Sequence, residues 1–316
     1  MHAYTLIAPG KINLYLEIIG DRPDGYHELI MILQSIDLAD RLTLRSNGLQ
    51  KCRLSCSHPQ VPLDETNLAY RAAVLMEQEF PKEFANYGGV DITIDKQIPV
   101  AAGLAGGSTD GAAVLVGLNL IWQLGLTQLE LQNLAALLGS DLPFCVSGGT
   151  AIATGRGEKL DQINNLANLY LVLAKYDSIA VSTPWAYQTY RQQFSDSYIN
   201  HLSGIEAKTH QVHAGPLVGA IVHKDGAKIG QLLHNDLEKV VLPAYPQVAQ
   251  LRETMQQAGG LGTMMSGSGP TVFTLCESRE QAAEIQQKIR QKLPDSDLQL
   301  WVAQLSNRGI QVETAS

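Results

Sequence analysis

The chain has 316 residues, a length that favours two domains over a single core. Hydrophobic residues form 45% of the sequence and charged residues 17%, which excludes a disordered chain and is typical of a folded globular protein. With 23 Lys and Arg against 31 Asp and Glu, the net charge of −8 argues against a nucleic-acid-binding protein, because such proteins neutralise phosphates with cations. A local basic pocket for one small anion is compatible with this charge.

Strand patterns dominate the first part of the chain. Apolar alternation and apolar runs predict strands at residues 14–19, 29–36, 42–44 and 90–95. A turn is predicted at Asp24-Gly25. Apolar stripes at helical spacing predict three helices, which begin after Thr66-Asn67, near Ser108 or Thr109, and at the Thr127–Glu130 capping box. Gly139 is predicted to end the last of them.

The second half of the chain alternates between strands and helices. Its predicted elements are strands at 169–174 and 298–302, helices at 248–258 and 278–292, and a glycine loop that enters a strand at 264–274. Residues 188–213 are polar and weakly periodic, and we interpret them as a helix with a long loop. The polar stretch 161–168 is interpreted as a linker, which predicts domains at 1–162 and 163–316. No internal repeat is present, which excludes a solenoid.

The four cysteines, Cys52, Cys56, Cys145 and Cys276, match neither a zinc site nor a disulfide framework. Cys52 and Cys56 have only His58 nearby, whereas structural zinc usually needs two cysteine pairs or a cysteine pair with a histidine pair. Ordinary thiols are the simpler interpretation, and they indicate a reducing compartment. The N-terminus lacks a signal-peptide pattern and every apolar run is too short for a bilayer, so we expect a cytoplasmic protein.

The strongest local motif is the glycine-rich run from Pro99 to Asp110. A strand leads into it, glycines fill the turn, and a helix with Ser, Thr and Asp at its cap leads out. Such a loop lets backbone N–H groups approach phosphate oxygens, with the positive end of the helix dipole behind them. It is neither a P-loop, because no lysine follows the glycines, nor a G-x-G-x-x-G loop. A phosphate cradle is predicted, with a simple glycine turn as the alternative.

Five polar or aromatic residues are further candidates for a site. Lys11 and Asn13 lie two apart on a predicted strand and therefore point to the same side, either into a cleft or into solvent. Asp141 follows a helix end among apolar residues, where it is either a paired proton acceptor or a turn cap. Tyr26 and His27 follow the predicted turn and could bind a ring or be ordinary strand aromatics.

In chain order these motifs resemble the GHMP kinase superfamily. The motifs are P-G-K-x-N, D-G-Y-H, E-T-N-L, P-x-A-A-G-L-A-G-G-S-T-D, S-D-L-P-F and S-G-S-G-P, and they extend from Lys11 to beyond Gly269. D-G-Y-H and S-D-L-P-F resemble the branch that acts on a cytidine-linked sugar alcohol. The resemblance implies an α+β fold of two domains, an N-terminal domain like domain 2 of ribosomal protein S5 and a ferredoxin-like C-terminal domain, with the active site between them.

The function implied by the resemblance is ATP-dependent phosphorylation of the 2-hydroxyl of 4-diphosphocytidyl-2-C-methyl-D-erythritol, in the non-mevalonate pathway to isopentenyl diphosphate. Mg²⁺ is implied as the metal; its protein ligands are not identified from the sequence, and Ser108 is a candidate. Two alternatives are another GHMP kinase, acting on homoserine, mevalonate or a sugar, and a ligand-sensing protein without catalysis. The implied partners are the small substrate and ATP, with no nucleic acid and no membrane.

The resemblance also implies roles for the matching residues. Asp141 would be the base that faces the substrate hydroxyl, and Lys11 would keep that carboxylate ionised and steady the transferred charge. Substrate-binding residues would be Asn13 at the erythritol hydroxyls, Tyr26 and His27 at the cytosine ring, and Thr183 and Tyr187 from a segment on the ring's other face. ATP-binding residues would be Asn67 and Lys96 beside the adenosine and, around the triphosphate, Pro99, Val100, Ala101, Ala102, Gly103, Leu104, Ala105, Gly106, Gly107, Ser108 and Thr109.

Two residues depart from the family's common loop pattern, G-L-G-G-G-S-S-D. Ala105 replaces a glycine, and Thr109 replaces a serine but keeps the hydroxyl. Ala105 adds a methyl group where close backbone approach is expected, so we expect its φ to be negative.

Overall fold

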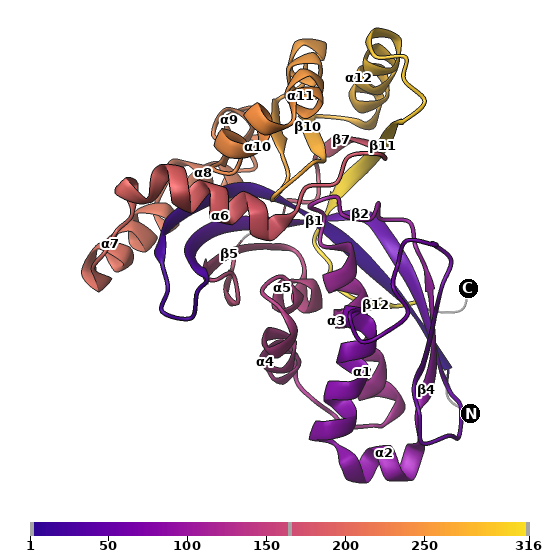
Figure 1. Ribbon diagram of the computed structural model, residues 1–316. Coiled ribbons are helices and arrows are strands. Elements are labelled where there is room, and N and C mark those ends of the chain that lie inside the picture. The colour runs from indigo at the N-terminus through magenta and orange to yellow at the C-terminus, as the bar shows by residue number, and fades with distance from the viewer. Residues whose placement is uncertain (1–2, 164–165, 314–316) are drawn as a thin grey trace.

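The computed structural model describes residues 3–163 and 166–313, and Figure 1 shows the course of the chain. The strands are β1 (Ala3–Asp21), β2 (His27–Ser46), β3 (Arg53–Cys56), β4 (Val90–Asp95), β5 (Thr150–Gly155), β6 (Lys159–Gln162), β7 (Tyr170–Tyr176), β8 (His234–Asn235), β9 (Gly262–Met265), β10 (Val272–Cys276), β11 (Leu298–Ser306) and β12 (Gln311–Val312). The helices are α1 (Leu68–Glu79), α2 (Pro81–Tyr87), α3 (Gly106–Ile121), α4 (Gln128–Leu138), α5 (Leu142–Ser147), α6 (Thr183–Phe194), the 3-10 helix η1 (Ser195–Ser197), α7 (Leu202–His213), α8 (Pro216–Val222), α9 (Gly226–Gln231), α10 (Glu238–Ala244), α11 (Pro246–Ala258) and α12 (Arg279–Lys292).

A long antiparallel hairpin of β1 and β2 runs through the molecule and curves as it does so (Figure 1). β4 and β5 also pair with β2, and the sheet continues from β2 through β11 to β7, β10 and β9. The β1–β2 ladder shifts register between Pro9 and Lys11 and again between Asn13 and Tyr15. Such irregularities bend a strand and redirect its side chains. They therefore determine the direction in which the side chains of Lys11 and Asn13 point.

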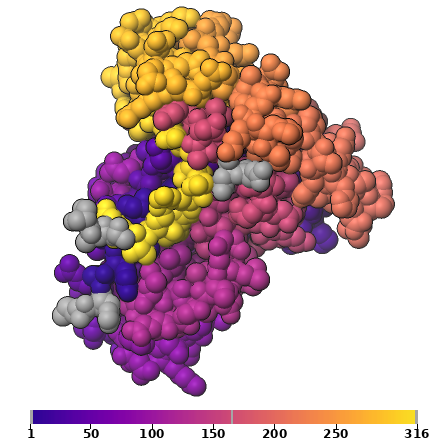
Figure 2. Space-filling model, turned by 180° about the vertical axis from the view of Figure 1, so that it is seen from behind, coloured from indigo at the N-terminus to yellow at the C-terminus, as the bar shows by residue number. Residues whose placement is uncertain are grey.

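The end of the chain returns to the N-terminal half. β11 pairs with β7 over residues 298–304, but its last residues, Leu305 and Ser306, pair with β2, and β12 pairs with β1. Seen from behind, the yellow C-terminal segment crosses the surface of the N-terminal part (Figure 2). The predicted strand at 298–302 is confirmed as the first part of β11, but β11 continues to Ser306 and β12 follows it, so it is not the last strand.

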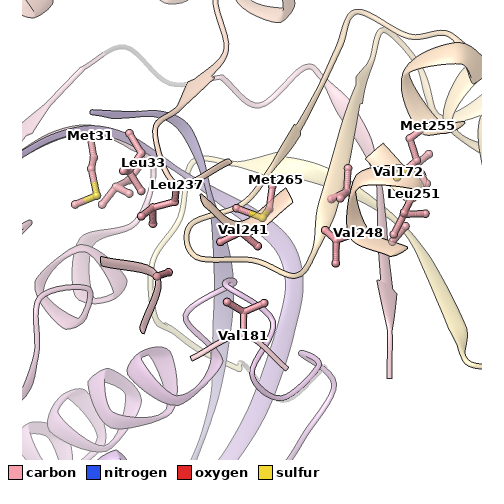
Figure 3. Packing of buried hydrophobic residues seen from close by; sticks show 14 of the residues in the cluster. Met31, Leu33, Val172, Val181, Leu237, Val241, Val248, Leu251, Met255 and Met265 are labelled. Carbon is pink, nitrogen blue, oxygen red and sulfur yellow. The ribbon is translucent and has the colours of Figure 1, made fainter. Parts of the chain in front are cut away.

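Three clusters of buried apolar side chains fill the molecule. One packs α1, α3, α4 and α5 against β1, β2 and β4. The other two pack helices of the second half against β7, β9 and β10 and against the β1–β2 hairpin. In Figure 3, Met31 and Leu33 of β2 belong to the same cluster as Leu237, Val241 and Met265. Side chains from both halves of the chain therefore share one core.

Local sequence signals predicted several elements correctly. β4 matches the predicted strand 90–95, Asn67 caps α1 through its side chain, and Thr127 forms the predicted capping box of α4. The predicted strands 29–36 and 42–44 are parts of the single strand β2, because the polar residues between them keep their pairing with β1.

Short elements escaped the sequence analysis. They are β3, β5, β6, β8, β12, α2, α5, α8, α9 and α10, which span two to seven residues each. The helices among them have at most seven residues, about two turns, which is too short for a helical spacing of apolar residues to be recognised, and β8 and β12 have only two residues each. α6 and α7 together occupy most of the segment 188–213 that was predicted as a helix with a loop, but α6 begins earlier, at Thr183.

The domain boundary between residues 162 and 163 stays a prediction. The polar stretch 161–168 on which it rests includes residues 164–165, which lie outside the described residues, and its first residues belong to β6. Within the part of the chain that the structure describes, no helix is both long enough and apolar enough to cross a membrane.

Candidate active site

A cavity of about 840 Å³ collects nearly all the predicted site residues. Its walls come from β1, the β1–β2 turn, the glycine loop before α3, the start of α5, α6, and the loop between β9 and β10. Of the residues predicted for the site, only Leu104 and Thr109 do not line it, and both are buried. Segments that are far apart in the sequence therefore form one site.

Lys11, Asn13 and Asp141 form a polar group at the floor of the cavity. The Lys11 ammonium donates to Asn13 Oδ1 at 2.9 Å and lies 3.5 Å from Asp141 Oδ2. Lys11 is 5% exposed and Asn13 is fully buried, so the interpretation as a solvent-facing strand surface is wrong. Asp141 precedes α5 but its side chain makes no capping hydrogen bond, so the turn-cap interpretation is also wrong. The carboxylate instead faces a buried cation.

The glycine loop passes tightly over the β9–β10 loop before it enters α3. Gly103 has φ +73°, and a Cβ there would lie 2.3 Å from the carbonyl oxygen of Ser266, so only glycine fits. The Ser266 hydroxyl donates to the Gly103 carbonyl at 3.1 Å, and the N–H of Lys11 donates to the Leu104 carbonyl at the same distance. These contacts fix the loop against both β1 and the β9–β10 loop.

The helix that follows the glycine loop starts earlier than predicted. α3 begins at Gly106, and Ser108 and Thr109 lie inside its first turns rather than at its cap. Ala105 starts the helix in the left-handed conformation with φ +58°, so our expectation of a negative φ is wrong. Such a backbone costs a non-glycine residue about 1–3 kcal/mol, and strain of this kind often occurs at functional sites. Gly106, Gly107 and Ser108 of the first turn of α3 line the cavity, and because the first N–H groups of a helix have no partner within it, this part of the cavity favours an anion.

Lys96 belongs to a buried cluster of charges beneath the glycine loop. Its ammonium contacts Asp40 Oδ2 at 2.5 Å and Asp110 Oδ2 at 2.8 Å. Asp40 also accepts from the backbone N–H groups of Gln97 and Ile98. Burial by itself lowers the pKa of Lys96, but the two carboxylates raise it above its ordinary value, while burial raises the pKa of Asp110. Lys96 therefore stays charged and supports the glycine loop through its packing beneath it.

Aromatic side chains form the opposite end of the cavity. The rings of His27 and Tyr187 lie 5.2 Å apart at 38°, and Tyr198 packs edge-on against His27. Tyr26 is 52% exposed, and the guanidinium of Arg156 lies 5.1 Å from its ring centre. This end of the cavity offers aromatic surfaces on which a flat ring can stack.

His27 has an unused hydrogen-bonding atom at this end. Its Nε2 is buried and makes no hydrogen bond within the described part of the chain. Burial lowers the pKa of His27, the nearby Arg191 cation lowers it further, and Asp21 opposes both effects. The ring is therefore neutral at pH 7 and can donate to or accept from a bound ligand.

Sequence analysis missed several residues that shape the site. Arg156 and Arg191 line the cavity, Asp40 and Asp110 hold Lys96, and Asn235 holds the β9–β10 loop. Asp110 stands in the glycine motif and Arg191 lies four residues after Tyr187 on α6, which are signals that could have indicated them. For Asp40 and Asn235 we find no local signal.

Replacing Asn235 by alanine should lower the free energy of unfolding by about 1–3 kcal/mol, because its buried partners lose their donor or acceptor. Its Nδ2 donates to the carbonyls of Met265 and Gly267 at 2.8 Å, and its Oδ1 accepts from Leu237 N–H. Denaturant unfolding measures the change. Asn133→Ala on the exposed face of α4 is the control, expected within about 0.5 kcal/mol of the wild type. Equal stability of both variants would contradict this role.

Comparison with known proteins places the chain in a family. The family model described as "GHMP kinases N terminal domain" matches residues 67–149, and "GHMP kinases C terminal" matches residues 217–295. A 4-diphosphocytidyl-2-C-methyl-D-erythritol kinase from Gloeothece citriformis is 80% identical to the chain, and the alignment covers 100% of both proteins. The chain belongs to the 4-diphosphocytidyl-2-C-methyl-D-erythritol kinase family. A family member from Microcystis aeruginosa is 62% identical over 99% of this chain and 100% of its own.

Solved structures agree with this membership. A crystal structure of 4-(cytidine 5'-diphospho)-2C-methyl-D-erythritol kinase, 29% identical, superposes with a TM-score of 0.73 over 95% of this chain and 98% of its own. A homoserine kinase from Cytophaga hutchinsonii has a TM-score of 0.74 over 99% of this chain and 98% of its own, but at 18% identity it shows the fold alone. The predicted GHMP kinase fold and the prediction of a small-molecule kinase are confirmed.

Proposed function

We propose that the protein transfers the terminal phosphoryl group of ATP to the 2-hydroxyl of 4-diphosphocytidyl-2-C-methyl-D-erythritol, in the non-mevalonate route to isopentenyl diphosphate. One observation carries the proposal: the Lys11–Asp141 pair lies in a single cavity with the glycine loop and with the ring pair of His27 and Tyr187. The two relatives of that name, 80% and 62% identical over nearly their whole length, support the same substrate.

The loop and the start of α3 suit the phosphates of ATP. At Gly107 an added Cβ would meet only the tip of Leu68, at 3.9 Å, so the backbone there is open to a ligand. The free N–H groups of the first turn and the helix dipole both favour negative charge. Asn67 lines the same cavity but uses its side chain to cap α1 and to donate to the Pro62 carbonyl. We propose that Asn67 and Lys96 shape the ATP pocket. The positive charge of Lys96 is already balanced there by the carboxylates of Asp40 and Asp110.

The chemistry that we propose uses the polar group at the cavity floor. Asp141 accepts the proton of the substrate hydroxyl while the hydroxyl oxygen forms a bond to the terminal phosphorus of ATP. The bond from that phosphorus to the bridging oxygen breaks, and ADP leaves. Lys11, 3.5 Å away, pairs with the carboxylate and stabilises the negative charge of the transferred group. Asn13 accepts a hydrogen bond from Lys11 through Oδ1, which positions the ammonium next to the reacting atoms.

Mg²⁺ would be held mainly by the phosphates. Over residues 3–163 and 166–313, no group of three or more His, Cys, Asp and Glu side chains is arranged to hold a metal ion. This fits Mg²⁺, which is commonly bound through one or two carboxylates together with phosphates and water. Ser108 lines the cavity and is the protein group that we propose for it. When bound, the ion neutralises charge on the phosphates.

The aromatic end of the cavity fits the cytosine ring. We propose that Tyr26 and Tyr187 stack on the ring and that His27 hydrogen-bonds to it. Thr183, whose hydroxyl lies 2.8 Å from that of Ser268, borders it.

All four cysteines are free thiols, as expected in a reducing compartment, which supports a cytoplasmic enzyme.

A substrate panel tests the proposal. The purified protein would be incubated with ATP, Mg²⁺ and, separately, 4-diphosphocytidyl-2-C-methyl-D-erythritol, homoserine, mevalonate or galactose, and ADP release would be followed. Turnover is expected with the cytidine substrate alone, because only that substrate places a ring against His27 and Tyr187. Comparable turnover with another alcohol, or none with the cytidine substrate, would overturn the proposal.

Replacing Tyr187 by alanine should raise the KM for the cytidine substrate by about tenfold or more, because a base stacked on an aromatic side chain gains about 1–3 kcal/mol, and about 1.4 kcal/mol is one decade. The KM for ATP should barely change, since the glycine loop lies at the other end of the cavity. His27→Ala should act in the same direction through lost ring hydrogen bonds.

A structural role of Tyr187 predicts a different result, because its side chain also packs against the core. Thermal melts and both KM values on Tyr187→Ala separate the two roles. A lower melting temperature with both KM values unchanged would remove Tyr187 from the substrate site.

A further inference from the structure

One face of α6 supplies three residues to the cavity at four-residue spacing. They are Thr183, Tyr187 and Arg191, and side chains at this spacing lie along one side of a helix. Thr183 and Tyr187 fall within the site predicted from sequence, whereas Arg191 does not. Its guanidinium extends away from α6 to the turn that joins β1 to β2.

Arg191 donates to several acceptors around that turn. Its Nε donates to Asp21 Oδ1 at 2.8 Å, and its Nη2 donates to the carbonyl of Gly25 at 3.1 Å and more weakly to that of Tyr26 at 3.5 Å. The planar guanidinium suits donation to several acceptors at once because its N–H groups are fixed in a fork. The partners are 165 to 170 positions away in the sequence.

The other hydrogen bonds of the turn are local. Arg22 N–H donates to the Tyr26 carbonyl, Gly25 N–H to the Arg22 carbonyl and Tyr26 N–H to Asp24, and the Arg22 guanidinium contacts Asp24 and Glu28. From outside the turn, Arg156 lies over the ring of Tyr26 and Tyr187 packs against the ring of His27. Gly25 has φ +85°, and a Cβ there would touch nothing within 4 Å, so this part of the turn is open. Among the described residues, every hydrogen bond between the turn and α6 comes from Arg191.

We infer that Arg191 is a positioning residue that latches the turn carrying Tyr26 and His27 onto α6, and so sets the width of the cytidine end of the cavity. The inference rests on the proposed function. Tyr26 and His27 belong to the hairpin turn, whereas Tyr187 belongs to α6, so the gap between them depends on how firmly turn and helix are joined. A preformed slot loses less conformational freedom when it binds a ring, which gives tighter binding.

Arg191 also acts on the charge of His27. The charged and titratable groups around this imidazole are Asp21 from β1, Arg191 and Tyr187 from α6, and Tyr198 after η1, with the Arg22–Glu28 pair beside it. Arg191 is the positive group that lowers the pKa of His27, and Asp21 opposes it. Together with burial, the latch therefore also favours the neutral form of the His27 ring.

Two substitutions separate the geometry from the charge. Arg191→Met removes both the hydrogen bonds to the turn and the positive charge beside His27. The KM for the cytidine substrate should rise by about tenfold, which corresponds to about 1.4 kcal/mol. The kcat and the KM for ATP should stay within about twofold of the wild-type values. The pKa of His27 should rise, so the acidic limb of kcat/KM for the cytidine substrate should move to higher pH. Arg191→Lys keeps the charge but loses the fork, so KM should rise while the acidic limb stays in place.

A matched control and a ligand-free measurement complete the test. The control is Arg290→Met. Arg290 lies on α12, away from the cavity, and its guanidinium also donates to a backbone carbonyl, that of Leu298. This substitution should leave both KM values unchanged. Hydrogen exchange of the free protein should show faster exchange of the turn, residues 22–27, in Arg191→Met and not in Arg290→Met.

The results distinguish this inference from the proposed function. An unchanged KM for the cytidine substrate in Arg191→Met, an equal rise in both KM values, or unchanged exchange of residues 22–27 would overturn the latch. If the wild-type protein fails to phosphorylate the cytidine substrate, the proposed function falls, and the exchange measurement still decides whether Arg191 holds the turn.

Discussion

Replacing Asp141 by asparagine is expected to lower kcat by about 10²- to 10⁴-fold, the usual contribution of a positioned general base. The amide keeps the shape of the side chain but cannot accept the proton of the hydroxyl, and it removes the negative partner that lies 3.5 Å from Lys11. Steady-state kinetics with ATP and the cytidine substrate measure the effect, with thermal melts to establish that the variant is folded.

The matched control for this substitution is Asp225→Asn. Asp225 caps α9 by accepting from Lys228 N–H, and asparagine caps a helix equally well, so kcat should be unchanged. Near-normal turnover of folded Asp141→Asn would show that another group accepts the proton.

Lys11 and Asp141 should behave as one unit. Lys11→Ala is expected to lower kcat in the same direction, because it removes the cation that faces both Asn13 and Asp141. If the two groups act together, the double variant should lose little more than the worse single variant. Losses that multiply would indicate that the two residues act independently.

Replacing Gly106 by valine should abolish ATP binding. A Cβ at this position would lie 2.9 Å from the ammonium of Lys96 and 3.1 Å from a methyl group of Ile98. Lys96 has little freedom to move, because Asp40 and Asp110 hold it on both sides in a buried setting. The branched side chain must therefore displace the first turn of α3, whose N–H groups are the proposed phosphate donors.

Calorimetry with each ligand separately tests this prediction. Binding of the cytidine substrate should be much less affected than that of ATP, because its aromatic contacts come from other segments. Gly219→Ala in α8, where a Cβ would meet nothing within 4 Å, controls for the loss of a helical glycine and should leave both affinities unchanged. Equal loss of both ligands in Gly106→Val would point to misfolding instead.

The sequence by itself determined the elements whose signals are local. Asn67 and Thr127 cap helices through hydrogen bonds to residues two or three positions away, and the strict alternation at 90–95 is a property of the strand β4 itself. Such signals need no knowledge of the rest of the chain. The order of the glycine-rich and polar motifs was likewise readable, and it predicted the GHMP kinase family that the comparisons confirmed.

Only the tertiary structure decided which isolated residues meet. Taken alone, Lys11 was compatible with a solvated strand face and Asp141 with a turn cap, and their proximity depends on how β1 packs against the start of α5. The same holds for Lys96 and Asp40, which lie 56 positions apart, and for Arg191 and Gly25, which lie 166 apart. Contacts over such separations follow from strand register and helix packing, which no local pattern encodes.

Backbone conformation at the glycine loop was also decided by tertiary contacts. Alanine alone favours a negative φ, as we expected for Ala105, yet the structure holds it at φ +58°. The residues just before Ala105 are fixed by Lys11 N–H at the Leu104 carbonyl and by the Ser266 hydroxyl at the Gly103 carbonyl, and the residue after it, Gly106, is held in the first turn of α3. When contacts fix the residues before and after a position, the surrounding structure can impose a conformation that the residue disfavours, and local preference no longer predicts the backbone.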